Sequence, residues 1–409
     1  MAPTPLSEIL SPGDRIVVGQ AAGEPVGLIE ELFKLAPTLG SVDVFCGLSL
    51  NPVWERTVPD ALHVSTYVGL GCMRNLVARR RARVVPASLS QISSLFASRK
   101  LPVDVVLLQV SPADAEGYHS LGCTLDYVWE AAQMARDVVV EVNETLPVTR
   151  GTKRFHSDHV TVARHSAAPL PQPAAEQISA AQRQVAQQVK TLIPDGATLQ
   201  LGIGGLANAV AGALAERRGL KIRSGMVGDW FVDLVENGAI DTDTPDACLA
   251  SIALGSARLY DFLSDQTLLS FALPSQLVEP IPASHLMAIN SGIEVDLVGQ
   301  VNTELIGARY VGTVGGQTDY FRAARQSAGG VAILALAASA GCGKSRIVAR
   351  CDHVTTAQSE VDVIVTEYGV ADIRNTTLKE RKALIAAIAD PHHRVALNAG
   401  QDPNKNTTP

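Results

Sequence analysis

Short runs of valine, isoleucine and leucine recur along the chain, and the stretches between them space their apolar residues three and four positions apart. The runs predict buried strands, and the spaced stretches predict amphipathic helices. Residues 27–35 are typical of the helical pattern, with apolar positions on one face. The clearest strands are predicted at residues 15–19, 42–45, 103–110, 137–142, 198–201, 330–335 and 361–366. The alternation predicts an α/β fold with mainly parallel sheets and right-handed crossovers.

A segment rich in proline and alanine, residues 167–175, interrupts this alternation. Its composition favours an exposed connector, and a helix is predicted directly after it, over residues 176–192. A chain of 409 residues is too long for one ordinary core. We therefore expect two tandem domains, residues 1–175 and 176–409, with the polar end of the chain frayed after residue 397.

Composition and charge exclude several classes of protein. Hydrophobic residues make up 46% and charged residues 18%, so the chain is neither disordered nor a coiled coil. A formal net charge of −7 provides no basic footprint for nucleic acid. No apolar run approaches the ~18 residues of a membrane span, and residues 1–13 lack the basic start and apolar core of a signal peptide. We expect a cytoplasmic protein with no nucleic-acid or membrane partner.

The cysteines are scattered, with no Cys-x-x-Cys pair. This spacing argues against a zinc site and against a disulfide framework, so we expect buried free thiols and no metal. The one dense basic run, residues 79–83, is interpreted as a solvated helix end, with contact to a polyanion as the alternative. The six cysteines are Cys46, Cys72, Cys123, Cys248, Cys342 and Cys351.

A glycine turn follows the predicted strand 198–201. Gly202, Gly204 and Gly205 can bring backbone N–H groups close to a ligand before a helix begins at about Asn208. Such amides suit an oxygen on which negative charge develops. Gly204 and Gly205 are therefore candidate catalytic donors, and Gly202 is a candidate ligand contact.

Three further segments carry candidate binding residues. In the turn Gly315, Gly316 and Gln317, the glycines allow close approach and the amide can read a carbonyl oxygen; the alternative is a tight turn with a surface amide. Gln109 and Asn143 end predicted strands, where open α/β sheets bind ligands. The alternative for both is that they cap a neighbouring backbone group.

Several motifs, in order along nearly the whole chain, resemble one family. They include Gln-Val-Ser-Pro-Ala-Asp at 109–114, Asn-Ser-Gly-Ile-Glu-Val-Asp at 290–296, Gly-Gly-Gln-Thr-Asp-Tyr at 315–320 and Thr-Glu-Tyr-Gly-Val-Ala-Asp at 366–372. Together these motifs resemble the acetyl-CoA hydrolase/transferase family, which includes 4-hydroxybutyrate and acetate CoA-transferases. The resemblance implies two CoA-transferase-type domains with a ligand cleft between them. It also implies coenzyme A as the carrier of an acyl substrate, a carboxylic acid or another acyl acceptor as partner, and a homo-oligomer.

One position departs from this pattern. The resemblance implies a nucleophilic glutamate in a His-Ser/Thr-Glu-Met step, which forms a glutamyl thioester, and Gly225 stands at the matching place in Arg-Ser-Gly-Met. Glycine has no carboxylate, so it cannot act as that nucleophile. Two explanations other than new chemistry stay open: an alignment offset by a few residues, or another carboxylate in the role. Further departures nearby are Gln20, Ala22, Ala207 and Trp230, for the family's histidine, cysteine, proline and glycine.

Other carboxylates are weighed for that role. Glu294 stands on an apolar strand, where a carboxylate needs partners, but the family pattern has a carboxylate here besides the nucleophile. A structural role is thus favoured, with a catalytic role kept as the alternative. Asp229 matches the family's aspartate and is expected to order its loop, with general-base action as the alternative. Glu24 matches an early glutamate and is also expected to order a loop.

These observations favour an enzyme that acts on an acyl-CoA thioester without a glutamate nucleophile. A polarised thioester carbonyl favours acyl transfer to a second substrate, hydrolysis or decarboxylation by non-covalent catalysis. One alternative is an ordinary CoA-transferase that uses another carboxylate. The other alternative is a non-catalytic subunit that binds acyl-CoA or acts as a scaffold.

Overall fold

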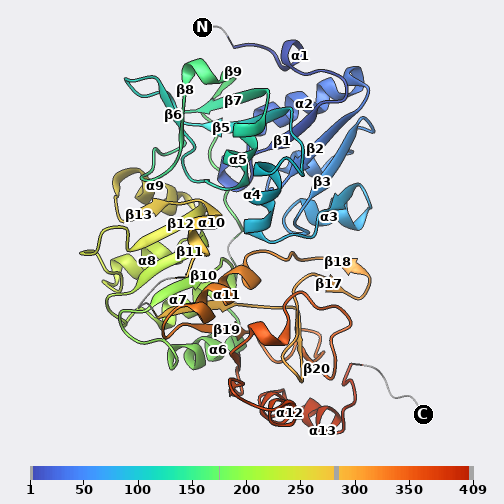
Figure 1. The fold of residues 1–409 in the computed structure, drawn as a ribbon, viewed down its shortest axis with the longest axis vertical. Coiled ribbons are helices and arrows are strands. Elements are labelled where there is room, and N and C mark those ends of the chain that lie inside the picture. The colour runs from blue at the N-terminus through green and yellow to red at the C-terminus, as the bar shows by residue number, and fades with distance from the viewer. Residues whose placement is uncertain (1–2, 175, 281–284, 405–409) are drawn as a thin grey trace.

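The computed structural model describes residues 3–174, 176–280 and 285–404, and its main strands form two large sheets (Figure 1). The first sheet is entirely parallel. Its order is β4 (Ala82–Val84), β3 (Leu62–Thr66), β2 (Val42–Cys46), β1 (Arg15–Val18), β5 (Val105–Val110), β7 (Asp137–Asn143) and β9 (Thr161–Ser166). Its helices are α1 (Leu6–Ile9), α2 (Val26–Leu39), α3 (Met73–Ala78), α4 (Leu89–Ala97) and α5 (Tyr127–Met134). A small antiparallel pair joins β6 (Tyr118–Ser120) to β8 (Arg154–His156).

The second sheet is parallel except at one edge, where β21 and β22 are antiparallel. Its order is β13 (Leu269–Phe271), β12 (Cys248–Ala253), β11 (Lys221–Val227), β10 (Thr198–Leu201), β14 (Leu286–Asn290), β19 (Val331–Ala335), β21 (Val363–Thr366) and β22 (Gly369–Asp372). Its helices are α6 (Ala180–Lys190), α7 (Gly205–Ala213), α8 (Trp230–Glu236), α9 (Ala257–Asp265), α10 (Pro274–Leu277), α11 (Gln317–Gln326), α12 (Leu378–Ala387) and α13 (Pro391–Asn398).

Short strands form two further small sheets beside the second large sheet. One sheet has the order β16 (Val301–Asn302), β15 (Glu294–Asp296) and β20 (Ile347–Val348). The other pairs β17 (Leu305–Ile306) with β18 (Arg309–Tyr310). The loop that follows β18 leads into α11, and this loop reaches back to the N-terminal half.

The predicted α/β class with mainly parallel sheets is confirmed, and a strand forms at each of the seven predicted positions. Two predicted helix starts are wrong. The helix after the glycine turn begins at Gly205, not near Asn208, and α6 begins at Ala180, where Ser179 caps it. The predicted boundary falls on Ala175, which lies outside the described residues, so the division into 1–175 and 176–409 stays a prediction. The fraying predicted after residue 397 also falls partly outside them, at 405–409.

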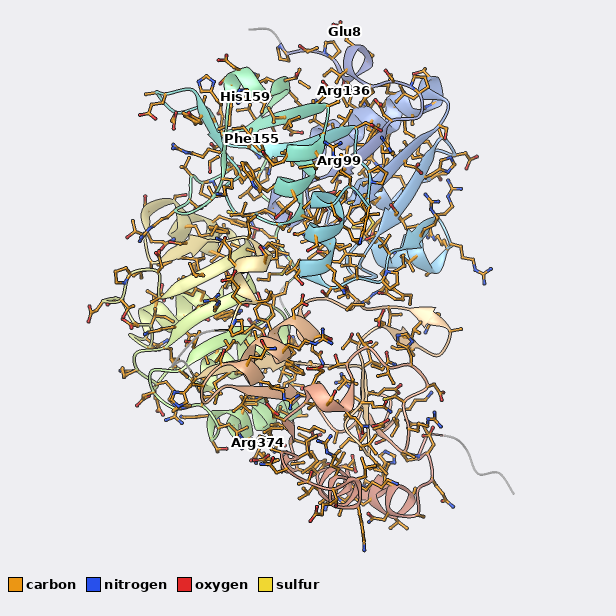
Figure 2. All side chains as sticks on the ribbon, viewed as in Figure 1. Glu8, Arg99, Arg136, Phe155, His159 and Arg374 are labelled. Carbon is orange, nitrogen blue, oxygen red and sulfur yellow. The ribbon has the colours of Figure 1, made fainter. Side chains whose placement is uncertain are left out.

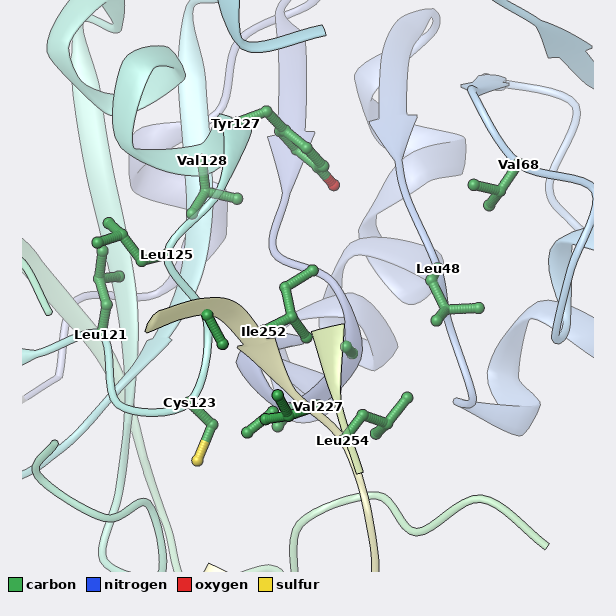
Figure 3. Close-up of a cluster of buried hydrophobic side chains, with 14 of the residues drawn as sticks. Leu48, Val68, Leu121, Cys123, Leu125, Tyr127, Val128, Val227, Ile252 and Leu254 are labelled. Atoms are coloured by element: carbon green, nitrogen blue, oxygen red, sulfur yellow. The ribbon is translucent and has the colours of Figure 1, made fainter. Parts of the chain in front are cut away.

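Backbone hydrogen bonds join the two halves of the chain. The Leu125 amide donates to the Ser251 carbonyl at 2.7 Å, and the Ala253 amide donates to the Cys123 carbonyl at 2.8 Å. Leu121, Cys123 and Leu125 belong to the loop of residues 121–125. Figure 3 shows side chains of this loop beside Ile252 and Val227 of the second sheet. Buried residues of both halves belong to one continuous hydrophobic core. The two sheets therefore share packing as well as hydrogen bonds.

Figure 2 draws the side chains on both halves and labels Glu8 and Arg136 of the first half and Arg374 of the second. Within the described ranges, no helix is long and apolar enough to cross a membrane. Five of the six cysteines are buried, but Cys342 is exposed, which contradicts the expectation of six buried thiols. Cys342 lies in a turn closed by the hydrogen bond from the Gly343 amide to the Ala340 carbonyl, outside any core.

Candidate active site

A cleft of about 750 Å³ lies between the second sheet and the N-terminal half, and we call it the main cleft. Its floor follows the carboxyl ends of β10 and β14, the edge at which open α/β sheets bind ligands. Leu70 and Arg74 reach it from the N-terminal half. The ligand cleft predicted between the halves is thus present. The lining on the C-terminal side includes Gly202, Asn290, Arg309, Gly315, Gly316 and Gln317.

A smaller space of about 170 Å³ adjoins the main cleft, and we call it the side chamber. Six residues line both spaces, so the two are continuous: Leu70, Gly202, Asn290, Thr313, Gly315 and Gly316. The described lining of the side chamber carries no Asp, Glu, Lys or Arg. Its own walls include Tyr67, Leu89, Gly225, Met226, Ile252 and Tyr320.

Gly225 belongs to strand β11 and lines the side chamber. It lies between two fixed neighbours in the strand: the Ser224 hydroxyl donates to the Leu201 carbonyl at 2.7 Å, and Met226 is paired with Ile252 of β12. A β-carbon on Gly225 would lie 3.0 Å from Leu89 Cδ2 and 3.2 Å from the Tyr320 hydroxyl oxygen. Any side chain at position 225 would therefore begin inside the side chamber and press on its wall.

The amino end of α11 contributes two polar groups without partners. The Tyr320 hydroxyl and the Gln317 amide nitrogen have no hydrogen-bond partner among the residues that the structure describes. Tyr320 is 2% exposed and Gln317 is 5% exposed. Burial raises the pKa of the Tyr320 phenol, the Asp319 charge adds to this, and Arg223 acts in the opposite direction. The hydroxyl is therefore protonated and available as a donor at neutral pH.

The glycine turn differs from the prediction. Gly202 lines both spaces, but neither Gly204 nor Gly205 lines either of them. The Gly205 amide donates to the Glu176 carboxylate at 2.6 Å, so it is already engaged in this structure, and its role as an oxyanion donor stays a prediction. The physical reason is that the first amides of a helix lack partners within the helix and attract a carboxylate. Gly204 has φ of +102°, which a glycine adopts readily as it leads into α7.

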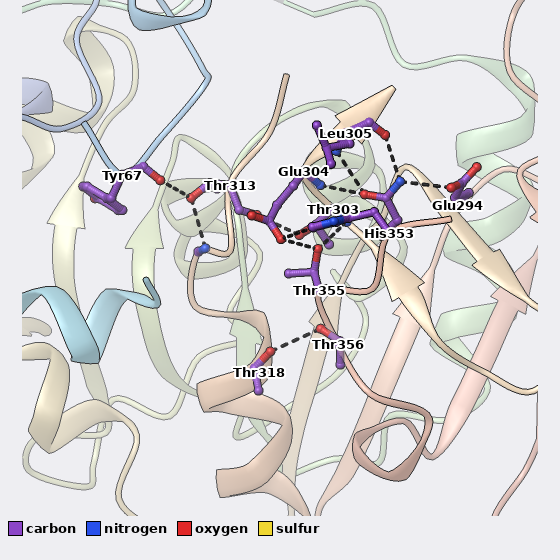
Figure 4. Close-up of polar contacts among 12 residues, drawn as sticks. Tyr67, Glu294, Thr303, Glu304, Leu305, Thr313, Thr318, His353, Thr355 and Thr356 are labelled. Carbon is purple, nitrogen blue, oxygen red and sulfur yellow. Dashed lines mark hydrogen bonds and ion pairs between the residues drawn. The ribbon is translucent and has the colours of Figure 1, made fainter. Parts of the chain in front are cut away.

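The two carboxylates proposed as catalytic alternatives point elsewhere. Asp229 accepts hydrogen bonds from the Ser256 amide at 3.0 Å and the Ser256 hydroxyl at 2.7 Å. Glu294 accepts one from the Asn302 side chain at 3.0 Å (Figure 4). Neither residue lines the main cleft or the side chamber. The hydrogen bonds are compatible with the loop-ordering and structural alternatives, and the catalytic roles of both residues stay predictions.

Gln109 and Asn143 also lie outside both spaces. The Gln109 side chain donates to the Ala22 carbonyl at 2.7 Å, and the Asn143 side chain donates to Gln109 at 2.9 Å and to the Ala168 carbonyl at 3.0 Å. Both side chains are thus engaged with protein groups, and the expected ligand contact stays a prediction for both residues. Their side chains satisfy buried groups at the ends of β5 and β7, as the capping alternative predicts.

A buried polar network fixes the wall behind Tyr67. The Tyr67 hydroxyl donates to Gln20 Oε1 at 2.9 Å, and Gln20 Nε2 donates to Asp126 at 2.6 Å. Burial raises the pKa of Asp126 to about 6. Glu24 accepts hydrogen bonds from the Ser49 hydroxyl at 2.7 Å and from the indole of Trp54 at 2.9 Å, and burial raises its pKa to about 7. Gln20, at the family's histidine position, thus supports Tyr67 from behind.

The loop over the main cleft is held by threonines, shown in Figure 4. The Thr313 hydroxyl donates to the Tyr67 carbonyl at 2.9 Å, and the Thr303 hydroxyl donates to the Thr313 carbonyl at 2.7 Å. Behind them the buried Glu304 carboxylate contacts His353 at 2.9 Å and the Thr355 hydroxyl at 2.7 Å. These contacts fix the loop that carries Gly315 and Gly316 against the N-terminal half.

Sequence reasoning missed several residues of the site. Tyr320 lies one helical turn after Gln317, so the motif that indicated Gln317 also contained it. Arg74 and Arg309 line the main cleft. In the basic run at 79–83, two arginines form ion pairs, Arg81 with Asp60 and Arg83 with Asp43. No pattern in the sequence marked the two cleft arginines.

Comparison with known proteins supports the resemblance. Residues 1–162 match the family model of the acetyl-CoA hydrolase/transferase N-terminal domain, and residues 255–400 match that of its C-terminal domain. The chain is 35% identical to a 4-hydroxybutyrate coenzyme A transferase from Clostridium kluyveri, over 94% of this chain and 92% of that protein. It is similar in structure to RipA from Yersinia pestis, with a TM-score of 0.87, 27% identity and coverage of 96% and 94%. A 4-hydroxybutyrate CoA-transferase from Porphyromonas gingivalis gives a TM-score of 0.79, 30% identity and coverage of 96% and 94%.

Proposed function

This chain belongs to the acetyl-CoA hydrolase/transferase family, and we propose that it processes an acyl-CoA thioester without an enzyme-bound glutamyl intermediate. Family membership makes it a transferase or hydrolase acting on acyl-CoA, and CoA is a substrate of the family. The observation that supports a reaction without a glutamyl intermediate is Gly225, which lines the side chamber and has no carboxylate. The proposal includes the cytoplasmic location and homo-oligomeric assembly expected from the sequence.

The main cleft suits the CoA part of the substrate. Arg74 and Arg309 provide cationic groups for phosphates, and Gly202, Gly315 and Gly316 allow a narrow chain to approach the backbone. The acyl group then lies at the boundary between the main cleft and the side chamber, where the shared lining is mainly apolar or glycine. This places the thioester where the two spaces meet.

The donors for the thioester carbonyl come from the amino end of α11. The first turn of the helix, whose residues Gly316 and Gln317 line the cleft, offers backbone amides that have no acceptor within the helix. Hydrogen bonds that strengthen as the oxygen becomes negative favour attack by an outside nucleophile or formation of an enolate. Acyl transfer, hydrolysis and decarboxylation all fit this arrangement, and none requires a metal.

A panel of acyl-CoAs mixed with the pure protein tests the proposal. Mass spectrometry should detect a product for at least one thioester, and borohydride treatment during turnover should leave every glutamate unmodified. A reduced glutamate side chain would show that a covalent thioester forms on the enzyme. Binding without turnover for the whole panel would favour the non-catalytic alternative.

A further inference from the structure

The side chamber contains a buried donor, the Tyr320 hydroxyl, that no residue described by the structure satisfies. We propose that it binds the carboxylate of an acyl acceptor, at the position where the family pattern has the nucleophilic glutamate, so that this carboxylate attacks the thioester directly. The inference rests on the proposed function, and it names the acceptor and the order of the reaction. The substrate thus supplies the carboxylate that Gly225 lacks.

Hydrogen-bond donors for a carboxylate converge at one end of α11. The Tyr320 hydroxyl lies in the side chamber, 3.2 Å from the place of a β-carbon on Gly225, and has no described partner. The Gln317 amide nitrogen lies one turn earlier in the same helix, also without a described partner, and lines the adjoining main cleft. Two side-chain donors near a helix amino end match the two oxygens of a carboxylate.

The other polar side chains of the chamber are already engaged. Asn290 donates to Gln200 at 2.6 Å, and the Tyr67 hydroxyl donates to Gln20. An acceptor that enters the chamber therefore finds Tyr320 as the free donor among the described lining residues. A neutral aliphatic group would leave this hydroxyl buried and unsatisfied, which is unfavourable.

The walls and volume of the side chamber limit the size and charge of the acceptor, and one carboxylate and one guanidinium lie near Tyr320. Arg223 lies close enough to Tyr320 for its charge to lower the phenol's pKa, and its guanidinium is held by the Leu277 and Gln276 carbonyls. The nearby Asp319 carboxylate is occupied by the Ser88 hydroxyl and the Ser90 amide, at 3.0 and 3.1 Å. The apolar walls and the volume of about 170 Å³ favour a short aliphatic acid over a dicarboxylate, whose second charge would lack a partner.

The reaction balances without a further reactant. A carboxylate oxygen of the acceptor bonds to the thioester carbonyl carbon, and the carbon–sulfur bond breaks with its electron pair leaving on the CoA thiolate. The resulting anhydride is attacked at the acceptor-derived carbonyl by the same thiolate. The carbon–oxygen bond then breaks, releasing the acceptor as its CoA thioester and the original acyl group as a carboxylate.

Initial-rate kinetics with propionyl-CoA and acetate test this order. A sequential reaction through a ternary complex should give intersecting double-reciprocal lines, whereas parallel lines would overturn the proposal. With oxygen-18 acetate in a single turnover, label should appear in propionate and not in the protein. Label in a protein carboxylate would also overturn it.

A Tyr320→Phe variant tests the proposed contact. The variant should raise the KM for acetate about ten- to hundredfold, the loss expected for a hydrogen bond to a charged group, with the KM for propionyl-CoA unchanged. Tyr118→Phe, on an exposed tyrosine of β6, is the matched control and should change neither KM. An unchanged KM for acetate in a folded Tyr320→Phe protein would overturn the assignment.

Binding of propyl-CoA, an unreactive thioether, separates this inference from the proposed function. If the protein fails to bind propyl-CoA and turns over no thioester, the acyl-CoA function itself is wrong. If it binds propyl-CoA and hydrolyses propionyl-CoA at a rate that acetate does not change, only the carboxylate site is wrong. Formation of acetyl-CoA that saturates with acetate supports both.

Discussion

The hydroxyl oxygen of Tyr320 lies 3.2 Å from the position that a β-carbon on Gly225 would occupy. Contacts of this length are tighter than nine in ten real contacts of a β-carbon, so a side chain at position 225 would require Tyr320 or Leu89 to shift by a few tenths of an ångström. The small residue in β11 and the large residue in α11 thus fit one another. The side chamber depends on both.

Restoring a glutamate at position 225 should therefore damage the protein more than it helps. We expect Gly225→Glu to lower the free energy of unfolding by about 1–3 kcal/mol through overpacking, and to abolish the activity of the parent. Urea denaturation and product assays check the two effects. Gly212→Glu adds the same charge in open space on α7 and serves as the control. A stable variant that gains ping-pong exchange between acyl-CoA and acetate would contradict this prediction.

Removing the Tyr320 hydroxyl should not destabilise the free protein. The hydroxyl is buried without a described partner, so Tyr320→Phe removes an unsatisfied group and keeps the ring in place. The free energy of unfolding should stay equal or rise by up to about 1 kcal/mol. Equilibrium urea unfolding provides the measurement. A loss of more than that amount would mean that the hydroxyl has a structural partner.

The contact between Glu176 and the Gly205 amide should contribute to stability rather than to chemistry. Replacing the carboxylate in Glu176→Gln weakens a charged cap on α7, and we expect a loss of about 1 kcal/mol. The KM for acyl-CoA should not change, since Glu176 lines neither space. Glu116→Gln, at an exposed position, is the control. A large change in that KM with unchanged stability would support the oxyanion role of Gly205.

Glu24 should make stability depend on pH. Its pKa is about 7 in the folded protein because it is buried, against about 4.3 in an unfolded chain, so the folded state holds the proton more tightly. Its contribution is fully present below the unfolded value and is lost as the pH rises through about 7. The free energy of unfolding should thus fall by about 3 kcal/mol from this group between pH 4 and pH 8.

A Glu24→Gln variant isolates that contribution. Glutamine does not titrate. As the pH rises, the free energy of unfolding of the wild type should therefore fall relative to that of the variant. Urea unfolding at several pH values checks this trend, with Glu8→Gln as an exposed control. A constant difference across the range would show that Glu24 titrates near its ordinary pKa.

The fold was predictable where strands are continuous apolar runs. The seven predicted strands are such runs, but the apolar strands β12 and β14 were not among them, and neither was β11, in which Lys221, Arg223 and Ser224 break the apolar pattern. Its place is set by parallel pairing with β10 and β12 on either side. Local composition carries little of that information, because the pairing is a tertiary effect.

The site was only partly predictable for the same reason. Gly202, Gly225, Gly315, Gly316 and Gln317 do line the two spaces, because glycine turns and a helix start have local signatures. By contrast, the partner of the Gly205 amide comes from a residue 29 positions away. A polar residue at the end of a strand, such as Gln109, can contact either a ligand or a neighbouring carbonyl. Residues distant in the sequence decide which of the two it contacts.

The backbone bonds from the 121–125 loop to β12 limit how a substrate can enter. The Leu125 and Ala253 amides are hydrogen-bonded across the halves, and one hydrophobic core includes residues of both. A hinge motion that separates the halves would break these bonds and expose that core. Admission must depend on local movement at the mouth of the main cleft, where the exposed residues Ile306 and Arg309 of the β17–β18 pair lie. It follows that freezing the 167–175 connector with a crosslink should leave turnover intact.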